Sequence, residues 1–157
     1  MSNEVSRIES ELEVRAYLQD MRYALDNGAA LSFQIDRRVD AGRNLKHTNR
    51  YTVNELFPDE NPQIALKREL KKLSVEDYLR TVRDTRFPNR SEMREFGKVY
   101  NGQDEIYIKV RVELLSSRAF GDHTVFVMSF HFAEKQFSEE YFPYKKANYE
   151  VQYGNSK

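Results

Sequence analysis

The chain contains no cysteine and no tryptophan, and its 157 residues include only four prolines and six glycines. The absence of cysteine excludes disulfide bonds and thiol catalysis, and it is compatible with a reducing cytosol. No long apolar run follows the first residues, so we expect no signal peptide, no membrane span and a cytoplasmic location. Basic and acidic residues number 25 each, so the formal net charge is zero, whereas a dedicated nucleic-acid-binding protein is more often strongly basic.

Charge is distributed unevenly, so a neutral total does not exclude a basic surface. Residues 37–50 hold five cations against Asp40 alone: Arg37, Arg38, Arg43, Lys46 and Arg50. A second cationic series leads into the C-terminal half: Arg80, Arg83, Arg86, Arg90, Arg94 and Lys98. Arginine forms bidentate hydrogen bonds with phosphate, so both series are candidate phosphate contacts, with ordinary solvated surfaces as the alternative.

Helices are predicted in the N-terminal half from the spacing of apolar residues and from cap signals. The first helix follows an apolar stripe that ends before Asn27-Gly28. The second begins with Asn61 as N-cap and Pro62 in its first turn, and a third begins with a capping box at Ser74. The predicted ranges are 6–26, 62–72 and 74–82, with a helical turn at 52–56.

The remaining segments predict strands at 31–35, 94–100, 104–115 and 124–132, with Asn101-Gly102 as a hairpin turn. The segment 124–132 is apolar on both faces, which favours the interior of a sheet. Because the helices precede most of the strands, we expect an α+β fold with two or three N-terminal helices on a small, mainly antiparallel sheet of three to five strands. Residues 1–144 are expected to form one domain, and 145–157 a tail that frays or adds an edge strand.

The strand from Glu105 to Leu114 has two different faces. Ile and Val residues, with Leu114, alternate on one side, whereas Tyr107, Lys109 and Arg111 share the other. Neighbours in this polar row are about 6 to 7 Å apart, from the rise of a strand. Such a row can bind a polyanion or transfer protons.

His131 is the histidine that most resembles a catalytic group. Simple alternation places Val125, Val127, Ser129 and His131 on one face of the strand, and the change from valine to serine and histidine suggests that this face leaves the core. An imidazole suits general acid–base chemistry at neutral pH, whereas a strand-end histidine bonded to the backbone is the alternative. The three histidines lack metal-ligand spacing, and no phosphate loop or nucleophile elbow is present, so we expect no metal and no cofactor.

Five short motifs occur along residues 73–144: Leu73–Tyr78, Phe96–Val99, Glu105–Lys109, Met128–Glu134 and Phe142–Tyr144. Together they resemble toxins of the MqsR-like group, which are small RelE-fold ribonucleases of bacterial type II toxin–antitoxin pairs. The resemblance covers roughly residues 30–144, since the basic stretch 37–52 also resembles the polar segment before the second helix of that group. Tyr-Ile-Lys and Ser-Phe-His, in adjacent predicted strands, are the best-matched motifs.

The resemblance implies cleavage of messenger RNA by attack of a 2′-hydroxyl on the adjacent phosphate, without a metal. Such a reaction needs a base, an acid and cations around the phosphorane. Tyr107 matches the tyrosine of the family's Tyr-Leu-Lys motif, and His131 stands where better-known members have a lysine after Ser-Phe. Arg80 occupies the place of a lysine after an Asp-aromatic pair, and Gly97, with Lys98 beside it, replaces the family's glutamine.

The leading hypothesis is therefore a metal-independent endoribonuclease toxin that acts on RNA and is neutralised by a cognate antitoxin. The predicted catalytic residues are Tyr107, His131, Lys109 and Arg80, and the predicted RNA contacts are Arg111, Lys98, Arg94, Arg37 and Arg38. A non-enzymatic nucleic-acid- or protein-binding regulator on the same fold, of phage or mobile-element type, is the alternative. A third interpretation is an antitoxin-like or structural partner that forms a homodimer through the helix 6–26, although core packing explains the same apolar stripe.

Overall fold

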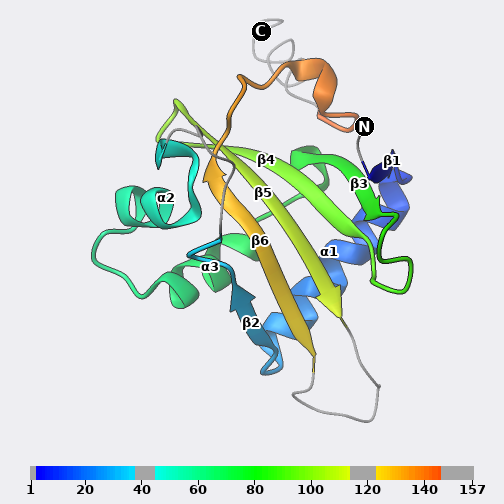
Figure 1. Ribbon diagram of the computed structural model, residues 1–157, viewed down its shortest axis with the longest axis horizontal. Coiled ribbons are helices and arrows are strands. Elements are labelled where there is room, and N and C mark those ends of the chain that lie inside the picture. Colours follow the sequence, from blue (N-terminus) through cyan, green and yellow to red (C-terminus); the bar gives the residue numbers. More distant parts are fainter. Residues whose placement is uncertain (1–2, 38–44, 114–122, 146–157) are drawn as a thin grey trace, which may run out of the picture.

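Strands from both ends of the chain meet in one sheet (Figure 1). The structure, a computed structural model, describes residues 3–37, 45–113 and 123–145. Within these ranges six strands pair in the order β1-β3-β4-β5-β6-β2, and all neighbours are antiparallel except β2 and β6. Their bounds are β1 (Glu4–Arg7), β2 (Ala30–Phe33), β3 (Tyr78–Asp84), β4 (Met93–Tyr100), β5 (Asp104–Glu113) and β6 (Thr124–Phe132).

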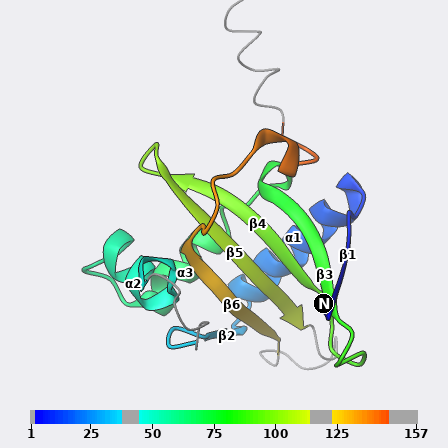
Figure 2. The same cartoon turned by 45° about the horizontal axis from the view of Figure 1, so that its top comes forward.

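The helices lie behind the sheet and beside its β2 edge (Figures 1 and 2). Their bounds are α1 (Glu11–Asp26), α2 (Asn49–Leu56) and α3 (Pro62–Leu70), with short 3-10 helices η1 (Leu45–His47), η2 (Val75–Asp77) and η3 (Glu139–Tyr141). No helix of the described ranges has the length and apolar character that a membrane span requires. The α+β class is thus confirmed, with six strands in the described residues where three to five were expected.

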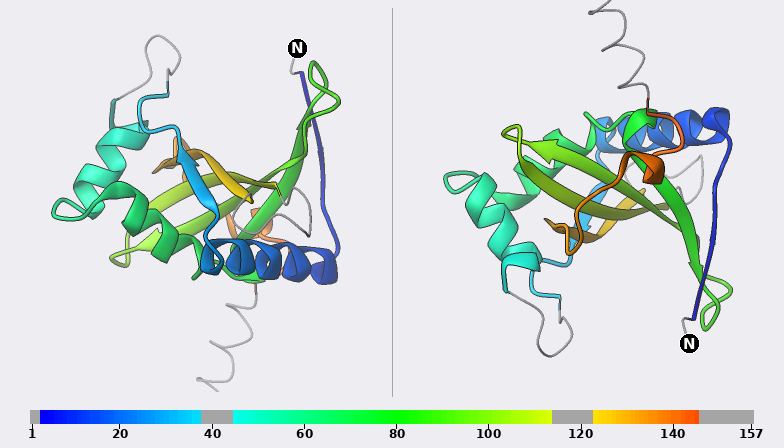
Figure 3. Two further views of the ribbon diagram at one scale, coloured as in Figure 1. Left: turned by 90° about the horizontal axis from the view of Figure 1, so that it is seen from below. Right: turned by 90° about the horizontal axis from the view of Figure 1, so that it is seen from above.

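The core lies between α1 and the sheet. Val14, Leu18, Met21 and Leu25 of α1 are each at most 2% exposed, and they pack on the apolar side chains of β4, β5 and β6. Figure 3 shows α1 running along the full width of the sheet on this side. The apolar stripe of the first helix is therefore core packing, as the pattern allowed.

The first helix begins later than predicted. Ser10 is its N-cap: the Ser10 hydroxyl accepts a hydrogen bond from the Glu13 amide at 3.1 Å, and the Glu13 carboxylate accepts one from the Ser10 amide at 3.1 Å. Residues 4–7, which the prediction placed partly in the helix, form β1 and pair with β3. The prediction was wrong here because a reciprocal capping box starts the helix at Glu11.

Residues 78–82 form a strand rather than the predicted helix. The cap at Ser74 starts only the 3-10 turn η2, after which the chain is extended as β3. Tyr78 pairs with Phe96 and Arg80 with Glu95, so Leu79 is the extra residue of a β-bulge. The bulge puts apolar residues at 78, 79 and 82, a spacing that resembles a helix although the backbone is a strand.

The predicted hairpin turn is confirmed. Asn101 has φ 53° and Gly102 has φ 75°, and these two residue types tolerate the left-handed region best. The helical turn predicted at 52–56 is the second half of α2. Most of the predicted loop at 116–123 and the tail after residue 145 lie outside the described residues.

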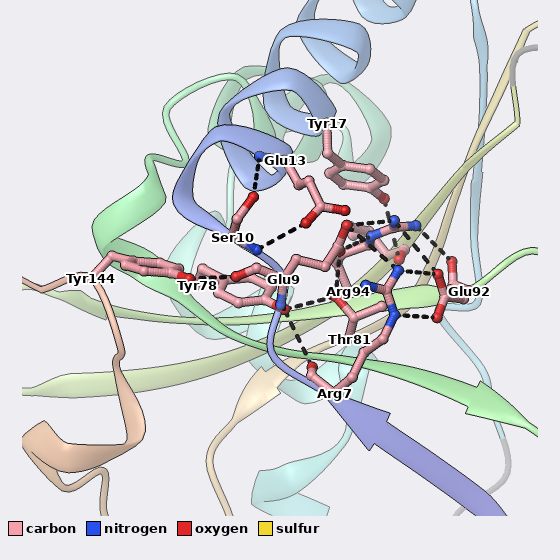
Figure 4. A network of polar contacts seen from close by, with 11 residues as sticks. Arg7, Glu9, Ser10, Glu13, Tyr17, Tyr78, Thr81, Glu92, Arg94 and Tyr144 are labelled. Atoms are coloured by element: carbon pink, nitrogen blue, oxygen red, sulfur yellow. Dashed lines mark hydrogen bonds and ion pairs between the residues drawn. The ribbon is translucent and has the colours of Figure 1, made fainter.

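Glu9 joins the start of α1 to the sheet and to the C-terminal segment (Figure 4). Its carboxylate is 3% exposed, and it accepts hydrogen bonds from Arg94 at 2.8 and 3.2 Å and from the Thr81 hydroxyl. Its amide donates to the Tyr78 hydroxyl at 3.0 Å, and its carbonyl accepts a hydrogen bond from Tyr144. The rings of Tyr78 and Tyr144 are stacked, so one buried residue ties the two ends of the described chain together.

Candidate functional site

A cavity of about 800 Å³ opens over the polar face of the sheet. We call the side chains that β3 to β6 contribute the floor: Arg80, Glu95, Tyr107, Lys109, Ser129 and His131. We call the segment after β6 the wall: Ala133, Glu134, Lys135, Phe137, Glu140 and Tyr141. In Figure 2 this segment, in orange, runs from the end of β6 toward β3.

Four floor residues form one row across four strands. The pairing places Arg80 beside Glu95, Glu95 beside Lys109, and Lys109 beside Ser129. The Arg80 guanidinium donates to the two Glu95 oxygens at 2.8 and 3.4 Å, and Lys109 Nζ lies 3.9 Å from Glu95 and 2.8 Å from Glu4 of β1. Glu95 is buried beneath two cations, whereas the Arg80 side chain is 46% exposed and accessible from solvent.

Tyr107 and His131 form the second row of the floor. They are direct cross-strand partners, and their ring centroids are 5.5 Å apart at an interplanar angle of 39°. Both side chains lie on the face of the sheet that points away from α1. The phenol and the imidazole therefore open into one cavity.

Gly97 completes this row and seats the wall. It pairs with Tyr107 from the other side. A Cβ atom at position 97 would lie 2.9 Å from the Phe137 ring and 3.0 Å from the Phe142 ring, so both rings rest directly on the glycine backbone. The Phe137 and Phe142 rings also meet edge to face, with their centroids 5.5 Å apart. The wall is therefore packed against the sheet through apolar contacts that a larger residue at 97 would block.

A β-bulge in β6 turns His131 toward the cavity. Lys109 pairs with Ser129 but Val110 pairs with Val127, which leaves Met128 as the extra residue. Beyond the bulge the faces exchange, so Val125, Val127, Phe130 and Phe132 pack in the core while Ser129 and His131 line the cavity. The expectation that His131 shares a face with the two valines was therefore wrong, because simple alternation does not survive a bulge.

Asn49 of α2 holds this bulge. Its side-chain amide donates to the Met128 carbonyl at 2.9 Å, and its carbonyl oxygen accepts from the Phe130 amide at 3.0 Å. It also donates to the Gln34 carbonyl at 2.7 Å, and it is 4% exposed. A residue of α2 thereby satisfies the Met128 carbonyl at the bulge and the Phe130 amide beyond it, in place of a partner strand.

An Asn49→Ala variant is expected to lose about 1–3 kcal/mol of unfolding free energy, since it leaves buried backbone groups of Met128 and Phe130 unpaired. Urea unfolding followed by circular dichroism measures the change. Asn54→Ala, at an exposed position of the same helix, is the matched control and should stay close to wild type. Equal unfolding midpoints for the two variants would contradict this role for Asn49.

The hydrogen bonding of His131 defines its tautomer. Its Nδ1 lies 2.9 Å from the Phe132 carbonyl oxygen, which can only accept, so Nδ1 carries a proton. In the neutral ring the basic lone pair is then on Nε2. The ring is 6% exposed, which limits its rotation and keeps it beside Tyr107.

Tyr107 keeps its proton. Burial raises the pKa of its phenol above the ordinary range, and the negative charge of Glu95 and a hydrogen bond with that carboxylate raise it further. The hydrogen bond with Glu95 also raises the pKa of Arg80, which outweighs the opposing effect of burial. At neutral pH the cavity thus offers a protonated phenol and a fixed guanidinium.

Two predicted RNA contacts lie on the other side of the sheet. Arg94 points toward α1, where it bonds Glu9 and lies over the Tyr17 ring at 4.4 Å (Figure 4). Lys98 is 3.5 Å from Asp77. Neither residue lines the cavity. Their positions indicate structural ion pairs.

Of the other predicted RNA contacts, only one is seen to line the cavity. Arg111 lies 3.0 Å from Glu113 and over the Phe126 ring at 4.9 Å, and it does not line the cavity. Arg37 is exposed and does line the cavity. Arg38 lies outside the described residues. Fewer of the predicted RNA contacts therefore line the cavity than the sequence suggested.

The predicted site residues did not include Glu95 or the wall, and Ser129 was named only as a neighbour of His131 on its face of the strand. Glu95 is the one carboxylate of β4 and lies next to the buried Phe96, and a carboxylate at such a position is a signal of a specific partner. Its partners come from β3 and β5, so the signal is visible only once the pairing is known. Among the described residues, no group of three or more His, Asp or Glu side chains is placed to hold a metal ion.

The site is thus a contacting tyrosine and histidine beside two ion-paired cations, in a cavity of the size that small ligands occupy. The likeness to MqsR-like toxins stays a prediction from short motifs. Comparison with known proteins adds nothing to it, since no family model, no curated protein and no solved structure matches this chain.

Proposed function

We propose that this chain is a metal-independent endoribonuclease that cleaves RNA by attack of a 2′-hydroxyl on the adjacent phosphate. The observation that carries the proposal is the contact of Tyr107 with His131 in a cavity that also contains Arg80 and Lys109. The reaction needs a base, a proton donor and positive charge at the phosphate, and these four side chains can supply all three.

The tautomer of His131 suits it to act as the base. Nε2 takes the proton of the 2′-hydroxyl as the bond from O2′ to phosphorus forms. Tyr107 stays protonated at neutral pH, so it donates its proton to the 5′-oxygen as the bond from that oxygen to phosphorus breaks. Proton return from the His131 imidazolium restores the phenol. The expected products carry a 2′,3′-cyclic phosphate and a 5′-hydroxyl.

Arg80 and Lys109 stabilise the charge that develops on the phosphorane. Arg80 is held by Glu95 through two of its nitrogens and remains accessible from solvent. Glu95 orients the guanidinium and contacts Tyr107, so it acts as a positioning residue. The resemblance to MqsR-like, RelE-fold toxins adds a biological setting to the proposal, which is a cytoplasmic toxin neutralised by a cognate antitoxin.

Incubation of the purified protein with a single-stranded RNA in the presence of EDTA tests the proposal. We expect fragments to accumulate from the RNA, whereas a DNA of the same sequence stays intact because it lacks the 2′-hydroxyl. Gel electrophoresis of end-labelled strands measures both. Intact RNA under every condition, or equal cleavage of RNA and DNA, would contradict the proposed reaction.

One observation favours a second function, a regulator that binds nucleic acid or protein without cutting. Lys109 is only 11% exposed and is paired with Glu4 and Glu95, so it offers less positive charge to a phosphorane than a free lysine would, which favours binding without cleavage. A binding protein on this fold would retain RNA on a filter without cleaving it. Its affinity would fall steeply with salt, as phosphate contacts require.

A further inference from the structure

We infer that the wall is a subsite for one unpaired nucleobase, with Tyr141 as the stacking platform and Glu140 as an acceptor for an exocyclic amino group. The inference rests on the proposed function, because it assigns the phosphate to the floor and the base to the wall. The substrate is then single-stranded RNA with an amino-bearing base at the cleavage site.

The two sides of the cavity differ in chemistry. The floor carries two cations, Arg80 and Lys109, against Glu95, whereas the wall carries aromatic rings and two carboxylates, Glu134 and Glu140, against Lys135. A nucleotide has two matching parts. Its phosphate is anionic and suits the floor, and its base is flat, with hydrogen-bond donors on its edge, and suits the wall. The charges of the cavity therefore favour one orientation of a nucleotide, with the phosphate on the sheet.

Tyr141 has the position of a stacking residue. It lines the cavity and is 50% exposed, although large aromatic side chains usually bury more of their surface. The Tyr141 amide donates to the Ser138 carbonyl at 3.0 Å, and the neighbouring Phe142 is buried on Gly97. The ring is thus presented on an anchored segment, so little order has to be gained when a base stacks on it.

Glu140 lies next to Tyr141 in η3 and also lines the cavity. A carboxylate accepts hydrogen bonds from the amino groups of cytosine, adenine and guanine, whereas the corresponding edge of uracil offers a carbonyl oxygen. Repulsion between that oxygen and the carboxylate disfavours uracil. The wall therefore selects bases with an exocyclic amino group.

A cavity with a wall on one side excludes paired RNA. A base in a duplex is stacked and paired, and it reaches such a cavity only after it has been turned out of the helix. Unpaired bases in loops and single strands stack on aromatic side chains without that cost. Single-stranded regions are therefore the expected substrates.

Binding of cytidine 3′-monophosphate and uridine 3′-monophosphate, measured by isothermal titration, tests the subsite without cleavage. We expect wild type to prefer the cytidine nucleotide. Tyr141→Ala should weaken its binding roughly tenfold, as loss of one base–aromatic stack does, and Tyr141→Phe should restore it. Tyr23→Ala, at a tyrosine of similar exposure on α1, should bind like wild type. Glu140→Gln should remove the preference for cytidine.

The outcomes separate this inference from the proposed function. Equal affinity of wild type and Tyr141→Ala for the cytidine nucleotide, or equal affinity of wild type for both nucleotides, overturns the subsite even if RNA is cleaved. Tyr141-dependent binding without RNA cleavage supports the subsite and overturns the endoribonuclease. In a cleaving enzyme, Tyr141→Ala should raise KM and leave kcat nearly unchanged.

Discussion

A His131→Gln variant is expected to lose RNA cleavage by about 10² to 10⁴-fold, the range that general acid–base catalysis contributes. Glutamine keeps a polar side chain of similar length but cannot take up a proton from the 2′-hydroxyl. Because the change removes chemistry rather than binding, kcat should fall while the affinity for RNA stays near that of wild type. Initial rates on an end-labelled single-stranded RNA in EDTA measure the loss.

His47→Gln is the matched control. His47 Nδ1 lies 3.0 Å from the same Phe132 carbonyl that His131 contacts, but His47 does not line the cavity. Both variants thus lose a histidine contact to this carbonyl, but only His131→Gln also loses the proposed base. Equal rates for the two variants would remove His131 from the mechanism, whereas a selective loss at His131 supports its role as base.

The second large effect is on stability. Glu9→Gln should lower the unfolding free energy by about 3 kcal/mol, the lower end of the cost of breaking a buried ion pair. The lower end applies because Arg94, left without its partner, still has Glu92 at 3.9 Å. For a chain of this length the melting temperature should fall by about 6–12 °C. Asp36→Asn, which breaks an exposed pair with Arg50, should leave it almost unchanged.

The contribution of Glu9 to the unfolding free energy should depend on pH. Burial alone would raise the pKa of Glu9, but hydrogen bonds from Arg94 and Thr81 and the charges of Arg94 and Arg7 outweigh it and lower the pKa below the ordinary value of 4.5. The stability that the ionised group contributes is therefore fully present above about pH 4.5 and is lost as the pH falls through the lowered value.

Urea unfolding of wild type and Glu9→Gln across the pH range measures this contribution. The difference in unfolding free energy should be constant from pH 7 to about pH 5 and should shrink below about pH 4.5. Comparison with the variant is essential, since other carboxylates such as Glu69 and Glu92 also have lowered pKa values. A difference that grows on acidification would contradict the assignment.

Much of the floor was predictable because β5 alternates without interruption. The pattern around Tyr107 and Lys109 alone indicated a half-buried strand with one polar face, and the register confirms that face. The hairpin at Asn101 was equally predictable, since few residue types adopt positive φ. In both cases the signal lies within a few neighbouring residues.

The orientation of His131 was not predictable in this way. It depends on the bulge at Met128, and the Asn49 amide that satisfies the bulge is 79 residues away in the chain. The strand β3 was predicted as a helix for a similar reason, because a bulge at Leu79 gives its apolar residues a helical spacing. The position of a bulge depends on contacts with residues from other elements, so the local sequence pattern does not predict it.

Arg94 shows the limit of charge patterns. The sequence placed it in a cationic series suited to phosphate, but its guanidinium lies on the helix side, paired with Glu9 and stacked on Tyr17. Arg80, fourteen residues earlier in the same series, does line the cavity. The difference between the two is the face of the sheet on which each arginine lies, which the pairing of β3 with β4 determines.

The chemical identity of the cleaved ends tests the central claim most directly. Mass spectrometry of the fragments, released in EDTA from an RNA with a single 2′-deoxy nucleotide at the main cleavage site and from the unmodified RNA, gives the answer. The proposed reaction predicts 2′,3′-cyclic phosphate and 5′-hydroxyl ends from the unmodified strand, and no cut at the modified position. Fragments with 5′-phosphate ends, or cleavage that persists beside the 2′-deoxy sugar, would contradict the account.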